Sequence, residues 1–552
     1  MDVNLSQVMR AVAGAVPDRE AVVQGAVRRT FAELVARGDR LAAVLARAGL
    51  GCHRERSELR PWESGQDHLA LYLHNGPEYL EGMLGAWAAR LAPFNVNYRY
   101  VAEELRYLLT DSHARAIVFH SAFAPVLEEV RPDLPDLEVL LQVPDGSGHH
   151  LLPDAQWYEE ALASVHAIPP EVEPSPDDLY ILYTGGTTGM PKGVLWRQAD
   201  IYVAALGGRQ LATGEEWPDL DAVVQSARNG GTKVLPAAPF MHGAAHWLAL
   251  NALGQGNTVV LPPHATTFDP AEVLRTVDRE GVGIVLIVGD AFARPLLDEI
   301  ERGGHDLSSL VLLISGGAAL SAPVKAGLLE QVPGMAIMDG LGASETGTQA
   351  SQITSAGGPV STGTFTPGAG MAIVSEDLTH ILPPGPEELG WLAQTGRVPL
   401  GYLGDEAKTA RTFPTIDGVR YSVPGDRARL TADGLLELHG RDSVTINSGG
   451  EKIFAEEVEA ALAHHPAVYD VVVTGRPSSR WGQEVVAIVQ LREGFEVPSE
   501  DLLAECERHV ARYKLPKAVV VVDQIVRSPA GKADYRWARR TAEAAAATAG
   551  GA

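Results

Sequence analysis

Apolar runs of strand length alternate with amphipathic stretches of helix length through the middle of the chain. The short apolar runs Ile284 to Val288 and Leu310 to Ile314 predict buried strands. Ala291 to Arg302 and Ser321 to Gln331 follow them as helical stretches. Asp269-Pro270-Ala271-Glu272 predicts a further helix start, because Asp caps a first turn and Pro is favoured at its first position. The alternation predicts an α/β fold, with a largely parallel sheet covered by helices.

The pattern changes after Gly440, where shorter strands and helices are mixed. The expected elements are a helix at Ala455 to His464, strands at Val468 to Thr474 and Glu484 to Leu491, a helix from Asp501, and a strand at Lys517 to Val522. We therefore expect a large N-terminal α/β domain at residues 1–440 and a small, mobile C-terminal α+β domain at residues 441–540. Residues 541–552, rich in Ala and Gly, predict a disordered tail, and residues 143–176 predict a surface connection.

The composition is that of a large globular protein. A chain of 552 residues suggests about three or four folding units. No apolar run approaches the roughly 18 residues that span a bilayer, and the first residues lack a secretory signal, so a cytoplasmic protein without an integral membrane segment is expected. Cys52 and Cys506 stand far apart, which fits a reducing compartment and offers neither a disulfide framework nor a metal cluster.

A formal net charge of −25 narrows the expected partners. Nucleic-acid binding has little support, because it depends on basic patches that neutralise phosphates. The same charge repels free ATP, so a nucleotide site in this chain needs local compensation from Lys, Arg, backbone dipoles and a divalent cation.

One glycine-rich segment offers such compensation directly after a predicted strand, Leu179 to Tyr183. It runs Tyr183-Thr184-Gly185-Gly186-Thr187-Thr188-Gly189-Met190-Pro191-Lys192-Gly193. Glycines let backbone N–H groups turn toward an anion, the threonines add hydroxyl donors, and Lys192 adds a charge. The segment predicts a triphosphate-binding loop, although a glycine-rich surface turn is the alternative. A Walker loop is disfavoured, because Gly193 stands where Ser or Thr would follow the lysine.

Two further clusters follow apolar stretches, the second of them the predicted strand Leu310 to Ile314. Asp339-Gly340-Leu341-Gly342-Ala343-Ser344-Glu345-Thr346 places a hydroxyl beside a carboxylate, a pairing that suits Mg²⁺ with phosphate. Glu345 is therefore a candidate metal ligand, and helix capping is its alternative role. Ser315-Gly316-Gly317-Ala318 allows the close approach of a flat ring, or forms a tight strand-to-helix turn.

Three other segments carry polar chemistry. Gly425-Asp426 and Gly440-Arg441 suit a sugar, because a carboxylate accepts ribose hydroxyls and a guanidinium addresses hydroxyl or phosphate oxygen. Arg527-Ser528-Pro529-Ala530-Gly531-Lys532 is a short turn that ends in a lysine. Taken singly, each of the three is typical of a surface turn.

In this order, the motifs resemble those of the adenylate-forming superfamily, which includes acyl-CoA synthetases, luciferases and the adenylation domains of peptide synthetases. The resemblance runs from the first helices to Lys532. Ser344 keeps the hydroxyl of the usual Thr, and three other positions depart from the usual pattern. Gly185 replaces a serine, Leu341 replaces the aromatic residue that packs on adenine, and Ser443 replaces the Asp or Lys at the hinge between domains.

The resemblance implies ATP and Mg²⁺ as cofactors, coenzyme A as co-substrate, and a role for each matching residue. It assigns Lys532, Glu345 and Thr187 to catalysis, Glu345 also to the metal, and His242, in Pro239-Phe240-Met241-His242, to substrate positioning. Ser448, Gly449 and Gly450 would line the passage for pantetheine after a rotation about Arg441 to Ser443. The nucleotide would be held by Thr184, Gly185, Gly186, Thr187, Thr188, Gly189, Lys192, Gly316, Gly317, Ala318, Asp339, Gly340, Leu341, Gly342, Ser344, Asp426, Arg441 and Lys532.

The implied activity is an ATP-dependent acyl-CoA synthetase that forms an acyl-AMP and then a thioester. Asn75 to Tyr79, Pro93 to Tyr100 and Gly449 to Phe454 are similar to fatty-acyl and steroid side-chain CoA ligases. The expected partners are a carboxylic acid, ATP and CoA, and a homodimer is possible. The alternatives are an enzyme that passes an aromatic or other acid to a carrier protein in trans, a luciferase-like oxygenase, and a catalytically silent nucleotide-binding protein.

Overall fold

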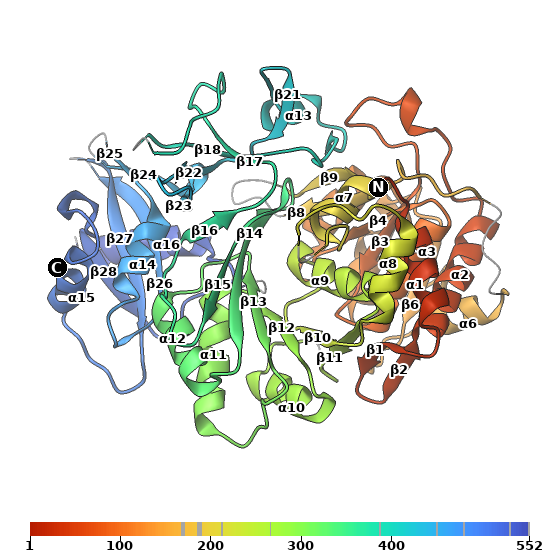
Figure 1. The fold of residues 1–552 in the computed structure, drawn as a ribbon, viewed down its shortest axis with the longest axis horizontal. Helices are drawn as coiled ribbons and strands as arrows, with labels where there is room; N and C mark the ends of the chain where they lie inside the picture. The colour runs from red at the N-terminus through yellow and green to blue at the C-terminus, as the bar shows by residue number, and fades with distance from the viewer. Residues whose placement is uncertain are drawn as a thin grey trace.

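The computed structural model of the chain contains a large N-terminal domain and a small C-terminal domain beside it (Figure 1). The structure describes residues 1–166, 172–184, 190–210, 213–264, 266–385, 388–448, 451–478, 481–528 and 531–549. Both domains combine helices with strands, so the predicted fold class is confirmed.

The central sheet of the N-terminal domain has a parallel core. Its neighbouring strands are β1 (Glu20–Gln24), β11 (Thr258–Leu261), β10 (Lys233–Pro236), β12 (Ile284–Ile287), β13 (Leu312–Gly316) and β14 (Ala336–Ala343). The expected helices are present as α10 (Pro270–Glu280), α11 (Gly289–Arg302) and α12 (Ala322–Gln331). Asp269 caps α10 by accepting the N–H groups of Ala271 and Glu272, as its sequence predicts.

Beyond β14 the same sheet becomes antiparallel and forms a smaller subdomain. β15 (Gly347–Ser355) turns back on β14 and is followed by β16 (Thr364–Pro367), β23 (Leu436–Arg441), β22 (Asp426–Leu430), β18 (Gly390–Thr395), β21 (Val419–Ser422) and β20 (Thr415–Ile416). β2 (Val27–Thr30) closes the other edge, and β17 (Met371–Val374) pairs with β18.

Two smaller sheets complete the N-terminal domain. One has the order β4 (Ala92–Asn95), β3 (His68–Tyr72), β5 (Ala114–His120), β6 (Val139–Val143) and β7 (Ala155–Trp157), all parallel. The other contains β19 (Gly401–Tyr402), β9 (Lys192–Arg197) and β8 (Leu179–Thr184). The expectation that residues 143–176 form only a surface connection is wrong, because β7 and α6 (Tyr158–Ala163) lie within it and Tyr158 is buried.

Most remaining helices of this domain surround the sheets. They are α1 (Leu5–Ala15), α2 (Phe31–Arg47), α3 (Pro77–Ala88), α4 (Ala102–Asp111), α5 (Ala124–Val130), α7 (Gln198–Ala205), α8 (Leu220–Arg228), α9 (Gly243–Gly254) and α13 (Glu406–Thr412). One hydrophobic core joins α1, α2, α3 and α9 to the central sheet. No helix within the described ranges is both long and apolar enough to cross a membrane.

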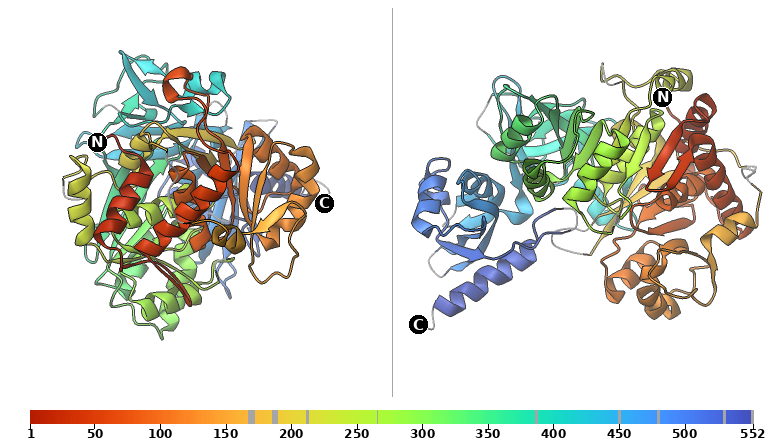
Figure 2. Two further views of the ribbon diagram at one scale, coloured as in Figure 1. Left: turned by 90° about the vertical axis from the view of Figure 1, so that its right-hand side faces the viewer. Right: turned by 90° about the horizontal axis from the view of Figure 1, so that it is seen from below.

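The C-terminal domain has the α+β order that its sequence predicts. Its sheet contains β25 (Glu451–Ile453), β24 (Ile446–Ser448), β27 (Gly482–Leu491), β26 (Val468–Ser478) and β28 (Ala518–Val522), and α14 (Ala455–Leu462) and α15 (Ser499–Glu507) contribute to its separate core. The disordered tail is a wrong expectation for residues 541–549, because α16 (Tyr535–Ala549) packs against β26 (Figure 2). Its Ala-rich sequence favours a helix intrinsically, and Ala538 and Ala542 are buried.

Candidate active site

The predicted phosphate loop connects two strands of the three-stranded sheet. β8 ends at Thr184 and β9 begins at Lys192, and these two residues face each other in the antiparallel pair. Gly185, Gly186, Thr187, Thr188 and Gly189 lie outside the described residues. Lys192 Nζ lies 3.6 Å from Asp111 Oδ1 and 4.0 Å from Asp405 Oδ2. Lys192 therefore stands at the base of the loop, between two carboxylates.

Glu345 lies in the turn that joins β14 to β15, so the alternative role of helix cap does not apply. Three side chains fix this turn. The Tyr402 hydroxyl donates to Glu345 Oε1 at 2.8 Å, Ser422 Oγ donates to the Glu345 carbonyl at 2.6 Å, and Trp196 Nε1 donates to the Ser344 carbonyl at 2.9 Å. The half-buried carboxylate is thus held in one orientation.

The glycines expected near adenine lie at the ends of two adjacent parallel strands. Gly316 ends β13 and pairs with Gly340 of β14, and a Cβ on Gly316 would lie 3.4 Å from the Gly340 carbonyl oxygen. Gly317 has a φ of +88°, and a Cβ on it would lie 3.7 Å from Lys532 Cε. Small residues here keep the strand ends open beside Lys532. Ala318 follows directly, and Gly342 and Leu341 continue along β14.

Asp339 is placed differently from the other residues of its motif. It is 8% exposed, and its carboxylate forms an ion pair with Lys325, which is fully buried. Burial raises the pKa of Asp339, while Lys325 acts in the opposite direction. Because the Asp339 carboxylate is paired with Lys325, Asp339 would bind a ligand through its backbone groups.

The two residues expected at the ribose are partners across one pair of strands. Asp426 begins β22 and Arg441 ends β23, and the two face each other in the ladder. Arg441 Nε donates to Asp426 Oδ1 at 3.0 Å. Asp426 is the main cause of a raised pKa of Arg441. Ser443 follows in a short 3₁₀ turn, Asp442–Val444, at the start of the C-terminal domain.

Lys532 lies on a tight loop that docks on the N-terminal domain. Arg527 anchors the loop through two hydrogen bonds of 2.7 Å to Asp470. Gly531, with a φ of +68°, comes so close to α11 that a Cβ would lie 3.0 Å from both the Val288 carbonyl oxygen and Ala291 Cβ. A larger residue there would push the loop and Lys532 away from the strand ends.

Lys532 shares its electrostatic surroundings with residues of the N-terminal domain. The pKa of Lys532 is lowered, mainly because the surrounding protein desolvates the ammonium. The residue as a whole is nevertheless exposed to solvent. Arg441 lowers the pKa further, while Glu345 and Asp426 oppose the change. The structure therefore brings the predicted lysine, arginine and two carboxylates together.

His242 occupies the N-cap position of α9, and its side chain makes no capping hydrogen bond. Burial lowers the pKa of His242 to about 3, and Lys532, His246 and Arg99 add to the effect. Its Nε2 is buried without a hydrogen-bond partner among the described residues. The imidazole is therefore neutral near pH 7 and has one ring nitrogen available to a bound molecule.

Two asparagines that the sequence analysis did not single out as site residues hold the His242 loop. Asn95 Nδ2 donates to the carbonyls of Tyr183 and Met241 at 2.9 and 2.7 Å, and Asn75 binds the backbone of Ala238 and Phe240. Both are buried. Both lie in segments that resemble fatty-acyl and steroid side-chain CoA ligases, but nothing in the sequence assigns either asparagine a role.

Ser448 does not join the cluster around Lys532. It ends β24 and pairs with Gly482, which faces Ser478 at the far end of β26. Gly449 and Gly450 lie outside the described residues. Because Arg527 is anchored at Asp470, eight residues earlier on β26 (470 to 478), the two loops are separated by roughly 27 Å of strand.

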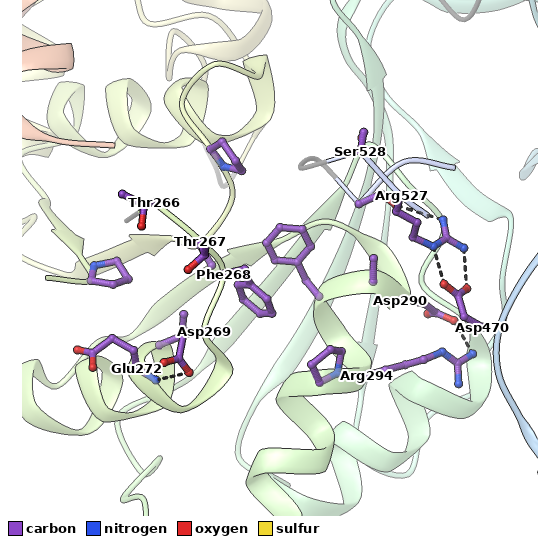
Figure 3. Close-up of a pocket in the computed structure, with 18 of the residues that line it drawn as sticks. Thr266, Thr267, Phe268, Asp269, Glu272, Asp290, Arg294, Asp470, Arg527 and Ser528 are labelled. Atoms are coloured by element: carbon purple, nitrogen blue, oxygen red, sulfur yellow. Dashed lines mark hydrogen bonds and ion pairs between the residues drawn. The ribbon is translucent and has the colours of Figure 1, made fainter. Parts of the chain in front are cut away.

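A cavity of about 370 Å³ lies between the two domains, next to the Lys532 loop (Figure 3). Phe268, Asp269 and Glu272 form one side of it, α11 contributes Asp290 and Arg294, and the C-terminal domain contributes Asp470, Arg527 and Ser528. Arg99, Pro239 and Gly531 also line it, so the cavity extends from the Lys532 loop toward the segment that carries His242.

Comparisons with known proteins agree with this arrangement. The family model described as "AMP-binding enzyme" matches residues 9–402, and "AMP-binding enzyme C-terminal domain" matches residues 457–532. The chain belongs to the AMP-binding enzyme family, which confirms the predicted superfamily.

Two similar proteins are acyl-CoA ligases by name. A medium-chain acyl-CoA ligase of Mycobacterium avium is 57% identical over 97% of both chains. A 3-oxocholest-4-en-26-oate–CoA ligase of Rhodococcus rhodochrous is 38% identical over 98% of this chain and 96% of its own. These relatives confirm the predicted reaction class, an ATP-dependent acid–thiol ligase that uses Mg²⁺ and coenzyme A.

A solved anthranilate CoA ligase in complex with anthranoyl-AMP shares the fold. Its TM-score is 0.82, with 22% identity over 99% of this chain and 98% of that chain. The likeness extends over both domains.

Proposed function

We propose that the cleft around Lys532 activates a fatty-acid or steroid side-chain carboxylate by adenylation and transfers the acyl group to coenzyme A. The observation that carries the proposal is the placement of Lys532, from the C-terminal domain, beside Glu345, Asp426 and Arg441 of the N-terminal domain. These residues supply one ammonium, one guanidinium and two carboxylates that act on one another electrostatically, a set of groups suited to a nucleotide joined to an acid.

The first step makes the acid reactive. A carboxylate oxygen attacks the α-phosphorus of ATP, the bond to the β-phosphate oxygen breaks, and pyrophosphate leaves. Lys532 stabilises the negative charge that collects between the carboxylate and the α-phosphate, and the Asp426–Arg441 pair holds the ribose.

Glu345 is the proposed ligand of Mg²⁺, which neutralises charge on the phosphates when bound. The described residues contain no group of three or more His, Cys, Asp or Glu that would hold a metal. A single carboxylate fits, because Mg²⁺ commonly takes one or two carboxylates together with nucleotide phosphates. The fixed orientation of Glu345 by Tyr402 supports this role.

The second step needs a different arrangement of the C-terminal domain. The thiolate of coenzyme A attacks the acyl carbon, and AMP leaves. Because Ser448 and the Lys532 loop occupy opposite ends of β26, one rigid domain cannot present both at the cleft at once. We infer a rotation about Arg441 to Ser443, after which the Ser448 loop would line the path of the thiol and His242 would border it.

The substrate class follows from the relatives. Their names specify medium-chain acyl-CoA and 3-oxocholest-4-en-26-oate–CoA ligation, and the higher identity is to the medium-chain enzyme. We therefore place medium-chain fatty acids first and steroid side-chain acids second. The cytoplasmic location, the domain boundary at residue 440 and the homodimer stay predictions.

The decisive experiment measures pyrophosphate release with octanoic, palmitic, 3-oxocholest-4-en-26-oic and benzoic acids, with and without coenzyme A. We expect the fastest release with octanoic acid, and thioester only when coenzyme A is present. Lys532→Ala should slow acyl-AMP formation by roughly 10²- to 10³-fold. Lys517→Ala, on the same domain but outside the cleft, is the control. Release with benzoic acid alone would overturn the substrate class, and normal adenylation by Lys532→Ala would overturn the role of Lys532.

A further inference from the structure

Tyr402, which lies outside the motifs found in the sequence, hydrogen-bonds to the Glu345 carboxylate. Tyr402 is 2% exposed and lies on β19, which pairs with β9 through Tyr402 and Val194. Its hydroxyl donates to Glu345 Oε1 at 2.8 Å. Since β9 begins at Lys192, the tyrosine belongs to the sheet that also carries the phosphate loop.

The ring of Tyr402 supports a half-buried lysine. Lys408, on α13, places Nζ 3.9 Å from the centroid of this ring. Within the described part of the chain, no carboxylate oxygen lies within 4.0 Å of Lys408 Nζ, and no hydrogen bond from Nζ is formed. A cation–π contact holds an ammonium in place without neutralising it, unlike a carboxylate partner.

Lys408 and Lys192 lie on two sides of one aspartate. Asp405 Oδ1 accepts the backbone N–H of Lys408 at 2.9 Å, and Asp405 Oδ2 lies 4.0 Å from Lys192 Nζ. Asp111 also lies near Lys192, so the charge of Lys192 is partly cancelled. Among the residues that the structure describes, no carboxylate makes such a contact with Lys408 Nζ.

The charges that act on Lys408 come from the same site. Desolvation lowers its pKa, Glu345 and Asp405 raise it, and Lys192 and Arg411 lower it. The ammonium thus lies within the field of both the metal-ligand candidate and the phosphate-loop lysine. A polyphosphate at this place would meet an ammonium that no carboxylate of the described residues contacts directly, in a chain of net charge −25.

We propose that Lys408, carried on the ring of Tyr402, is a second lysine for the β- and γ-phosphates of ATP and for the pyrophosphate that leaves, and that Tyr402 is the positioning residue of Glu345. The inference rests on the proposed adenylation reaction. It assigns the two residues to the first half-reaction alone, because the second half-reaction involves no pyrophosphate.

The test compares Lys408→Met, Lys408→Arg and the control Lys233→Met, whose lysine pairs with Glu280 at 3.5 Å near the start of β10. Three quantities are measured: the KM for ATP in pyrophosphate release, the inhibition constant of pyrophosphate, and the rate of thioester formation from synthetic octanoyl-AMP and coenzyme A. Lys408→Met should raise the first two about tenfold, equivalent to about 1.4 kcal/mol, and leave the third unchanged. Lys408→Arg should restore binding, and Lys233→Met should behave as the unmodified protein.

A second variant tests the metal site independently of the phosphate contacts. Tyr402→Phe should raise the Mg²⁺ concentration that half-saturates adenylation, with no change in thioester formation from octanoyl-AMP. Lys408 would have only a packing role if Lys408→Met left the inhibition constant of pyrophosphate unchanged. The same conclusion would follow if the variant slowed both half-reactions equally. If the unmodified protein releases no pyrophosphate with any acid, the proposed function fails instead.

Discussion

His242 illustrates how its surroundings limit the chemistry of a single residue. Burial and nearby cations, Lys532 and Arg99 among them, lower its pKa to about 3. A histidine that is already neutral at pH 6 gives no ionisation step between pH 6 and 8. Its unpaired buried Nε2 instead suits a hydrogen bond to substrate, so the residue is better placed for positioning than for general-base work.

His242→Asn should reduce kcat/KM for thioester formation, while the pH profile between 6 and 8 keeps its shape. The measurement is kcat/KM at half-unit pH intervals for both proteins. Tyr513→Phe, on the exposed surface of the C-terminal domain, is the matched control. Loss of an inflection near pH 6.5 in His242→Asn would show that the imidazole does ionise during turnover.

The residues that act on ligands were easier to predict than those that orient them. Lys532, Glu345 and Arg441 follow glycines or strands in short polar motifs, so their residue types carry the signal. Tyr402 and Asn95 act only because β19 and β4 bring them against Glu345 and Met241. Such contacts arise from pairing between distant segments, which spacing along the chain does not reveal.

Among the elements, α14 carries a half-buried carboxyl, Glu459, whose pKa is strongly raised. Burial and the neighbouring Glu456 raise the pKa of Glu459 to about 8, although one oxygen accepts the Val473 N–H at 2.8 Å. The folded protein therefore keeps this proton at pH 7, whereas the unfolded chain releases it above its ordinary pKa of about 4.3. The resulting stability is fully present below that value and is lost as the pH rises toward 8.

Glu459→Gln should remove this pH dependence. Between pH 5 and pH 8 we expect the variant to gain stability over the unmodified protein by on the order of 3 to 4 kcal/mol. Urea denaturation at the two pH values measures the difference. Exposed Glu500→Gln on α15 is the control. A difference that is the same at both pH values would mean that Glu459 is ionised in the folded protein.

The periodicity along the chain located the central elements well. β12, β13, α11 and α12 lie within a few residues of their expected bounds, because buried strands and amphipathic helices each have a clear pattern. The antiparallel pairing of β14 with β15 was not expected, since neither strand is a continuous apolar run. The helix that continues past residue 541 was missed because the Ala-rich sequence after Ala542 offers no apolar periodicity.

For the whole molecule, the contacts between the domains fix one of the two domain orientations that the two half-reactions need. The Lys532 loop packs on α11 through Gly531, and Arg492 Nη1 lies 3.9 Å from Asp298 Oδ1 across the interface. Both contacts hold Lys532 at the cleft, while the Ser448 hairpin is held elsewhere, with Lys452 Nζ 3.3 Å from Glu376. This orientation fits adenylation and leaves thioester formation to a second one.

A reversible crosslink across this interface should therefore separate the two half-reactions. Asp298→Cys and Arg492→Cys, in a Cys52→Ser background, place two partly exposed thiols where the ion pair now lies, and Cys506 is buried. A short reducible bis-thiol reagent should leave one round of octanoyl-AMP formation intact and slow thioester formation by at least about 100-fold, because the thiol path is not assembled. Reduction should restore the full reaction, and each single-cysteine variant treated with the reagent controls for modification alone. Thioester formation at the uncrosslinked rate would mean that both steps use the orientation seen in the structure.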